Sequence, residues 1–124
     1  MLLAGVTDYR EGRMLPGHRS DPHEAMRAAP ETDVKILLAH QPKNIFEAAR
    51  AGYDLQISGH THGGQVNIPF WGAPILPVHN KSYISGLVTA PKTSIFISKG
   101  LGWTILPVRF NCLPEIAVLK LEAI

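Results

Sequence analysis

The sequence predicts an α/β domain in which a parallel strand–helix–strand unit is followed by antiparallel strands. Two observations carry this prediction: apolar runs alternate with helical patterns before Gly59, and short strand-like runs broken by Gly and Pro follow it. The chain of 124 residues has room for one domain, so we expect a single domain over 1–124. Its hydrophobic content of 45% is ordinary and its charged content of 18% is low, which excludes an ordinary disordered tail.

Three apolar runs in the first half of the chain, at 2–6, 34–39 and 55–58, are predicted strands. The run at 34–39 is nearly all apolar, which is typical of a strand covered on both faces. A strand, a helix and a second strand with short joins form a parallel crossover unit. We therefore expect the strands at 34–39 and 55–58 to be parallel neighbours.

Two short helices are expected in the gaps between these strands. Asp21 is the predicted cap of the first helix, which runs to about Ala29 and stops at Pro30. The second helix is expected to begin with Asn44 as its cap. It ends before Gly52, which lies where a left-handed residue commonly terminates a helix.

Three further strands are expected in the second half of the chain, at 81–89, 94–98 and 115–121. The first two can pair in antiparallel fashion through a turn at 90–93. The last run is apolar on both faces until Lys120, so we expect it to be a central strand.

The charge and cysteine content exclude several classes of protein. The net charge is only +2 and the sequence has no dense Lys/Arg stripe, so we expect no nucleic-acid partner. The single cysteine, Cys112, excludes an intrachain disulfide, and we expect a small buried side chain there. The uncharged stretch 55–80 contains too many Gly, Pro, Gln, Asn and His residues to span a bilayer. The first residues lack the basic region of a signal peptide, and the location of the protein is left open.

Three of the six histidines follow predicted strands. His40 comes directly after the strand at 34–39, and His60 and His62 come just after the strand at 55–58. Ligands of open α/β sheets gather beyond the carboxyl ends of the strands, and imidazole nitrogens bind metal ions well. The alternative is that these are ordinary polar turn residues. The other three histidines are expected to be solvated loop or helix-start residues: His18, His23 and His79.

Two segments resemble signatures of the calcineurin-like metallophosphoesterases. The segment 58–65, SGHTHGGQ, resembles the last signature of that family, and the segment 37–42, LLAHQP, resembles the preceding one. Further similarity to a bacterial subgroup, often membrane-associated, extends the resemblance over essentially the whole chain and involves residues 5–8, 98–102, 107–109 and 114–116.

The resemblance implies a β-sandwich flanked by helices and a metal-dependent phosphoester hydrolase. Members of the family hold two divalent ions at strand ends, which polarise the phosphoryl oxygens and activate the nucleophile. By family match, His40 and His60 would bind one metal ion and His62 the other. Imidazole accepts zinc, iron, manganese or nickel, so the identity of the metal stays open.

Other residues have less specific expected roles. Asp8 ends a predicted strand beside the histidines and is a candidate for orienting a ligand histidine; a plain loop-start carboxylate is the alternative. Arg109 is a candidate for binding the substrate phosphate, although we favour an ion pair with Glu115. Trp71 and Trp103 are expected to anchor loops by packing.

The earlier motifs of the family are missing from this sequence. No Gly is followed by Asp, no Gly-Asn-His triplet is present, and the Asp-x-His at 21–23 begins a helix. The family's acid histidine is therefore absent, and the chain resembles only the C-terminal half of the domain. We expect weak or no hydrolysis of phosphoesters by the chain alone; the alternative is a non-catalytic truncated module that binds one metal ion or none. Half a sandwich leaves apolar surface uncovered, so self-association or pairing with a separate N-terminal half is expected.

Overall fold

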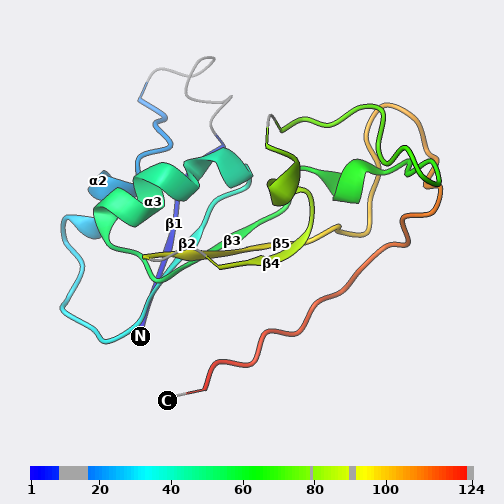
Figure 1. Ribbon diagram of the computed structural model, residues 1–124. Coiled ribbons are helices and arrows are strands. Elements are labelled where there is room, and N and C mark those ends of the chain that lie inside the picture. Colours follow the sequence, from blue (N-terminus) through cyan, green and yellow to red (C-terminus); the bar gives the residue numbers. More distant parts are fainter. Residues whose placement is uncertain (9–16, 79, 90–91, 123–124) are drawn as a thin grey trace.

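The computed structural model describes residues 1–8, 17–78, 80–89 and 92–122 (Figure 1). These residues form one five-stranded sheet with the strand order β1-β2-β3-β5-β4. The elements have these bounds: β1 Leu2–Gly5, α2 Pro22–Met26, β2 Lys35–Leu38, α3 Ile45–Ala51, β3 Leu55–Ser58, β4 Gly86–Val88 and β5 Ser94–Ile97. The strands β1, β2, β3 and β5 are parallel, and β4 is antiparallel to β5. The predicted α/β class, with a parallel unit followed by an antiparallel pair, is confirmed.

The helices α2 and α3 lie on one face of the sheet, where they cover its buried core (Figure 1). One cluster joins Leu37 and Ala39 to Ala48 of α3 and to Tyr53. A second cluster of buried residues consists of Ile45, Ile95 and Ile97. Burial also raises the pKa of the Tyr53 phenol, whose hydroxyl donates a hydrogen bond to the backbone of the α2 helix.

The helix boundaries follow local signals in most places. The Asp21 carboxylate accepts hydrogen bonds from the backbone N–H groups of His23 and Glu24, which confirms its predicted capping role. The helix ends at Met26, earlier than expected. Gly52 has φ of 86°, in the left-handed region, and terminates α3 as predicted.

The predicted cap at Asn44 is wrong. Its amide donates to the hydroxyl of Ser20 at 2.7 Å and makes no capping hydrogen bond. A 3₁₀ turn at Pro42–Asn44 leads into the helix instead. The local pattern predicted that Asn44 caps the helix, but its side chain bonds instead to Ser20, which is distant in the sequence.

The opposite face of the sheet has no helix over it among the described residues. Leu38, Ile57, Phe96 and Leu87 are paired across strands in register on this face, and Leu3, which pairs with Ile36, lies on the same side. We call these apolar residues the open sheet face: Leu3, Leu38, Ile57, Phe96 and Leu87. Leu3 is 57% exposed and Leu87 is 65% exposed. The helices thus cover only one side of this sheet.

The predicted strand at 81–89 is only partly present. Residues 81–83 form a 3₁₀ turn, because the Asn80 side chain accepts a hydrogen bond from the N–H of Ser82. Strand β4 occupies 86–88 and pairs with β5 as expected. Part of the turn predicted between these strands, at 90–91, lies outside the described residues.

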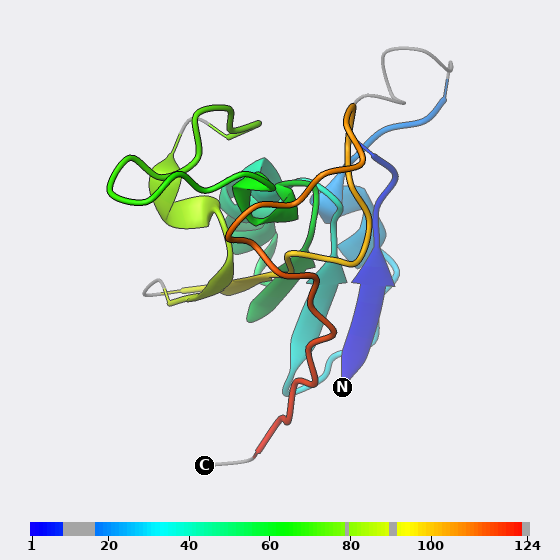
Figure 2. The ribbon, with the colours of Figure 1, turned by 90° about the vertical axis from the view of Figure 1, so that its right-hand side faces the viewer.

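The C-terminal arm, residues 101–122, departs most from expectation. The prediction of a central strand at 115–121 is wrong: these residues form no strand, and Val118 is 91% exposed. Figures 1 and 2 show the last part of the arm, drawn red toward the C-terminus, running on the side of the sheet opposite the helices. A segment that is apolar on both faces needs neighbours on both faces, and the described residues supply neither a pairing strand nor a covering layer for it.

Other packing expectations have mixed outcomes. Trp71 and Trp103 are 87% and 60% exposed, so the prediction that they anchor loops by packing is wrong. Cys112 is buried, as predicted. His18 and His23 are exposed, in agreement with their predicted solvated positions, and His79 lies outside the described residues. No helix in the described parts of the chain is long and apolar enough to cross a membrane.

Candidate metal centre

Two histidines meet at the carboxyl ends of neighbouring parallel strands. His40 lies two residues after β2, and His60 lies two residues after β3. Their rings are arranged edge to face, with centroids 5.1 Å apart and an interplanar angle of 76°. The N–H of Gly59 donates to the carbonyl of His40 at 3.1 Å, which extends the pairing of the strands up to the histidines. The strand register therefore brings these two imidazoles together as the sequence predicted.

The backbone beyond β3 turns sharply and adopts unusual conformations. His60 and His62 have φ values of 69° and 51°, in the left-handed region that costs about 1–2 kcal/mol per non-glycine residue. The Thr61 hydroxyl holds this turn, because it accepts from the N–H of Gly63 and donates to the carbonyl of Ile84 at 2.6 Å. Backbone strain of this kind is often found at functional sites.

The two glycines of this turn are required by close packing as well as by their positive φ. A Cβ added at Gly63 would lie 2.8 Å from the Sγ of Cys112, and one added at Gly64 would lie 2.5 Å from the Cβ of Ala73. The loop after His62 is thus pressed against the loops of the second half of the chain. This packing fixes where the His62 backbone lies.

Arg109 also holds the His62 turn in place. Its guanidinium donates to the carbonyl of His62 at 3.3 Å and to the carbonyl of Lys99 at 2.7 Å. The other acceptors are the carbonyls of Gly100, Gly102 and Cys112. The favoured ion pair with Glu115 is wrong, since Glu115 pairs with Lys99 at 3.6 Å. Substrate binding by Arg109 stays a prediction, although these hydrogen bonds give it a structural role.

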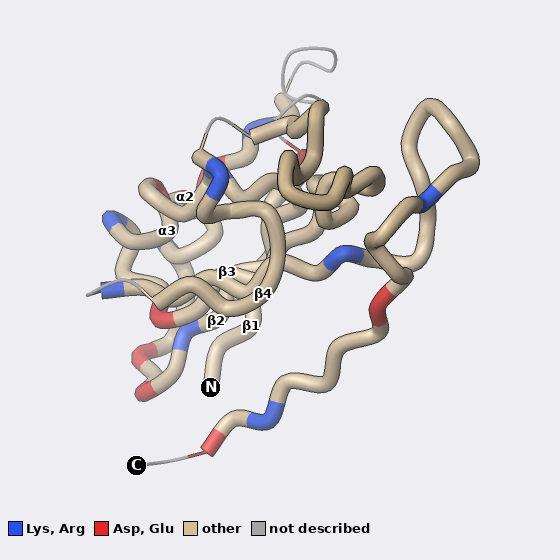
Figure 3. Tube along the Cα trace, turned by 45° about the vertical axis from the view of Figure 1, so that its right-hand side comes forward, with Lys and Arg blue, Asp and Glu red and all other residues tan. Residues whose placement is uncertain are grey.

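Asp8 lies beside His40, on the side of the sheet edge that the sequence predicted. One carboxylate oxygen accepts a hydrogen bond from the Gln41 amide at 3.0 Å, and the other lies 4.0 Å from Nε2 of His40. The second distance is too long for a hydrogen bond. The segment 55–78, which contains His60 and His62, has no Lys, Arg, Asp or Glu of its own. Figure 3 shows the charged residues dispersed over the rest of the trace. Asp8 therefore supplies negative charge next to the histidine pair.

His62 does not join the histidine pair in this conformation. Its Nδ1 atom is buried and has no hydrogen-bond partner among the residues that the structure describes, a situation that costs about 1–3 kcal/mol. Over 1–8, 17–78, 80–89 and 92–122, no group of three or more His, Cys, Asp and Glu side chains is placed to hold a metal ion. The described residues therefore supply part of a metal site. The imidazoles of His40 and His60 lie close together, and the buried Nδ1 of His62 is a further candidate ligand atom.

A buried polar network under the edge was missed by sequence reasoning. Gln56 is fully buried in β3, and its amide donates to the Gln41 carbonyl at 3.2 Å and to the Ser58 hydroxyl at 2.8 Å. The Ser58 hydroxyl donates in turn to the carbonyl of Ala39 at 2.6 Å. The signal that could have found it is a glutamine inside an otherwise apolar strand, since buried polar groups need specific partners.

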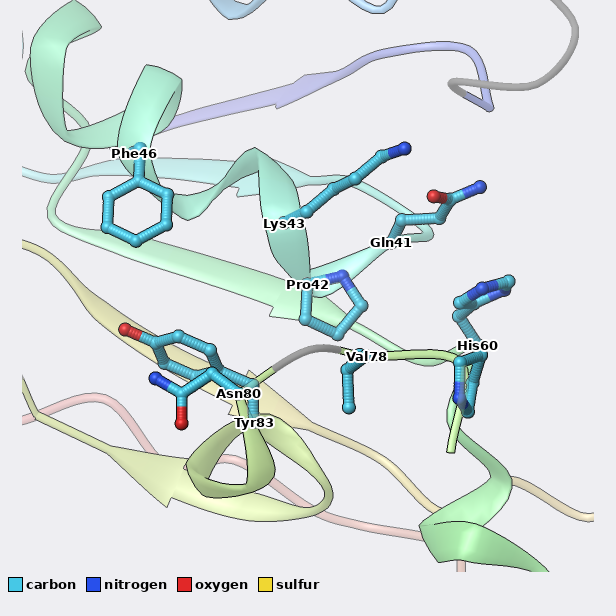
Figure 4. A pocket seen from close by; sticks show the side chains of 9 residues that line it. Gln41, Pro42, Lys43, Phe46, His60, Val78, Asn80 and Tyr83 are labelled. Atoms are coloured by element: carbon cyan, nitrogen blue, oxygen red, sulfur yellow. The ribbon is translucent and has the colours of Figure 1, made fainter. Parts of the chain in front are cut away.

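A pocket opens next to His60. It has a volume of about 290 Å³ and lies between the segment 41–46 on one side and Pro77, Val78, Asn80 and Tyr83 on the other. Figure 4 shows His60 at one end and Phe46 and Tyr83 toward the other. Most of the surface between them is apolar. His60, one member of the histidine pair, therefore borders a small concave site.

Comparisons with known proteins give a consistent set of relatives. The chain is 43% identical over 88 residues to an uncharacterized metallophosphoesterase of Bacillus subtilis (strain 168), YkuE, which covers 71% of the chain. It is 37% identical over 87 residues, 70% of the chain, to the phosphodiesterase YaeI of Escherichia coli (strain K12). It is 39% identical over 121 residues, 96% of the chain, to an uncharacterized metallophosphoesterase of Helicobacter pylori (strain ATCC 700392 / 26695).

The matches cover only part of each relative. The aligned regions span 31%, 32% and 31% of the three relatives, so the chain corresponds to about a third of their length. No family model and no solved structure matches. Two of these relatives are named metallophosphoesterases, and they match 71% and 96% of this chain; the chain belongs to the calcineurin-like metallophosphoesterase family.

Proposed function

We propose that this chain forms part of a metal-dependent phosphoester hydrolase and contributes histidine ligands to its metal site. In this proposal His40 and His60 bind one divalent ion, and His62 binds a second. The observation that carries it is the pair of imidazoles with ring centroids 5.1 Å apart at the ends of β2 and β3. The names of the relatives, a phosphodiesterase among them, support the same class of reaction.

Each residue has a distinct proposed task. The metal ions would supply positive charge that polarises a phosphoryl oxygen and strengthens the attacking water as a nucleophile. Asp8 positions His40 and balances part of the positive charge, because its carboxylate lies beside the ring and is itself held by Gln41. Arg109 is proposed to keep the His62 turn in place through the His62 carbonyl.

We further propose that this chain corresponds to the C-terminal part of the whole domain. The family's earlier motifs, which carry the remaining metal ligands and the acid histidine, are not in this sequence. Hydrolysis by the isolated chain is therefore expected to be weak or absent, whichever of zinc, iron, manganese or nickel is supplied.

A second candidate function is a non-catalytic module that binds one metal ion or none. The observation that favours it is that no group of three ligating side chains is assembled in the described part of the chain. The two candidates share the fold and differ in the number of metal ions that the protein holds.

Metal binding by the purified chain tests the proposal. We expect that His40→Ala and His60→Ala each weaken Zn²⁺ or Mn²⁺ binding at least about tenfold, measured by calorimetry, because each removes a direct ligand. His23→Ala is the matched control, because His23 is an exposed histidine that pairs with Glu47 on the helices. Unchanged affinity in both site variants would contradict the proposal. Elemental mass spectrometry then separates the candidates: about two ions per chain favours the hydrolase, and one or none favours the module.

The open sheet face supports a proposal about partners. A sheet face with exposed Leu3, Leu38 and Leu87 is costly in water, and such patches are usually covered by another protein surface. We propose that a second copy of the chain, or a separate N-terminal half, covers it. Light scattering is expected to show particles larger than a monomer, and Leu87→Glu is expected to reduce their size. A clean monomer would contradict self-association.

A further inference from the structure

We infer that the pocket beside His60 receives the apolar part of the substrate, an aryl or short hydrocarbon group esterified to the phosphate. This inference rests on the proposed function, because it places the phosphate at the histidine pair. It goes further by assigning the chemical class of the group that the phosphate carries.

The shape of the pocket gives the direction in which a substrate would lie. Figure 4 shows His60 at one end, Pro42 and Val78 along the middle, and Phe46 and Tyr83 at the far end. A phosphate held near the His40 and His60 rings would project its ester substituent along this line. The substituent would then lie between the α3 side of the pocket and the side formed by Val78 and Tyr83.

Phe46 is the most informative lining residue. It lies in the first turn of α3, where its neighbours Ile45 and Ala48 are buried in the core, yet Phe46 itself is 62% exposed. It therefore contributes little to the core clusters. An aromatic ring on the wall of a pocket offers a flat apolar surface against which a ligand ring or chain can pack.

The size and charge of the pocket narrow the class of ligand. A volume of about 290 Å³ is at the lower limit of small-molecule sites, which run from about 300 to 1,000 Å³, so the pocket suits a single ring or a short chain. Among the described residues, its lining includes Lys43 and no carboxylate. The described lining therefore offers no carboxylate as a counter-charge to a cationic substituent.

Binding of two phosphonates to the full chain tests the inference. Phenylphosphonate and methylphosphonate carry the same anionic group on an unhydrolysable carbon–phosphorus bond and differ in apolar size. In the presence of Zn²⁺ we expect phenylphosphonate to bind about tenfold more tightly, because the pocket removes its ring from water. Phe46→Ala is expected to abolish most of this preference and to leave methylphosphonate binding unchanged.

The controls separate failure of the inference from failure of the proposed function. Phe70→Ala removes a fully exposed ring outside the pocket and is expected to leave the tenfold preference unchanged. Phe46→Leu, which keeps apolar bulk, is expected to retain part of this preference.

Equal Zn²⁺-dependent binding of both phosphonates, or a preference that survives Phe46→Ala, overturns the inference and leaves the proposed function standing. A preference for phenylphosphonate that is the same without Zn²⁺ and in His60→Ala supports the apolar site and contradicts the proposed metal centre. Absence of binding by either phosphonate contradicts both.

Discussion

The sheet with its two helices and the C-terminal arm are both rich in aliphatic side chains, but only the first region buries them. Leu37 of β2 and Ile97 of β5 are completely buried, whereas Ile105 and Val118 of the arm are 92% and 91% exposed. The composition of the two regions does not explain this difference. It arises from what surrounds each segment.

Strands β2 and β3 have a hydrogen-bonded neighbour on each edge and helices over one face. The first part of the arm is held by hydrogen bonds to the turn at 62–67 and to Gly100. The N–H of Phe110 donates to the Gln65 carbonyl and the N–H of Glu115 to the Gly100 carbonyl, both at 3.0 Å, and the Arg109 guanidinium donates to the His62 carbonyl. Beyond Glu115, Ile116 and Val118 are 81% and 91% exposed, and Leu119, at 38% exposed, is partly covered. An apolar segment is therefore stabilised by burial only where the fold brings partners to it.

The largest expected effect tests this contrast directly. Leu37→Ala removes a fully buried side chain and is expected to lower the free energy of unfolding by about 2–5 kcal/mol. Val118→Ala in the arm is expected to change it by less than about 0.5 kcal/mol, because that side chain is already in water. Urea unfolding of both variants checks the prediction. A comparable loss in Val118→Ala would mean that the arm is covered in solution, for example by a second copy.

The glycines give a smaller contrast between the same two regions. Gly64→Ala is expected to destabilise the protein by about 1–3 kcal/mol, because its Cβ would overlap the Cβ of Ala73 and its φ is 81°. Gly102→Ala in the arm is the matched control, since a Cβ there meets nothing within 4 Å. Thermal unfolding measures both variants. Equal stability of the two would show that the turn after His62 adapts more readily than its packing indicates.

The smallest expected effect concerns the connection between the regions. Arg109→Lys keeps the charge but loses the planar set of donors that binds several carbonyls at once, and it is expected to cost about 1–2 kcal/mol. Faster hydrogen exchange at the amides of the His62 turn and of 99–102 is expected in the variant. Unchanged exchange at the His62 turn would contradict a positioning role for Arg109.

Much of the fold in the first half of the chain could be predicted because its signals are local. The Asp21 cap, the end of α3 at Gly52 and the strand at 55–58 each depend on residues within a few positions of one another. The placement of His40 and His60 followed from the same signals, since parallel neighbouring strands carry their ends to one edge.

The remaining features depend on partners far away in the sequence. The side chain of Asn44 bonds to Ser20, and Arg109 bonds to the carbonyl of His62. The Gln56 network and the pocket at Phe46 also join segments that no periodicity connects. A local sequence pattern cannot predict these contacts, because they form only when the fold brings distant segments together.

The sequence by itself determined the α/β class, the order of its main elements and the two histidines that meet at a strand edge. The tertiary structure decided which apolar runs are buried, and it left 115–121 exposed and His62 apart from the histidine pair. The physical reason is that dihedral preferences and caps act between neighbouring residues, whereas burial and ligand convergence need surfaces from distant parts of the chain.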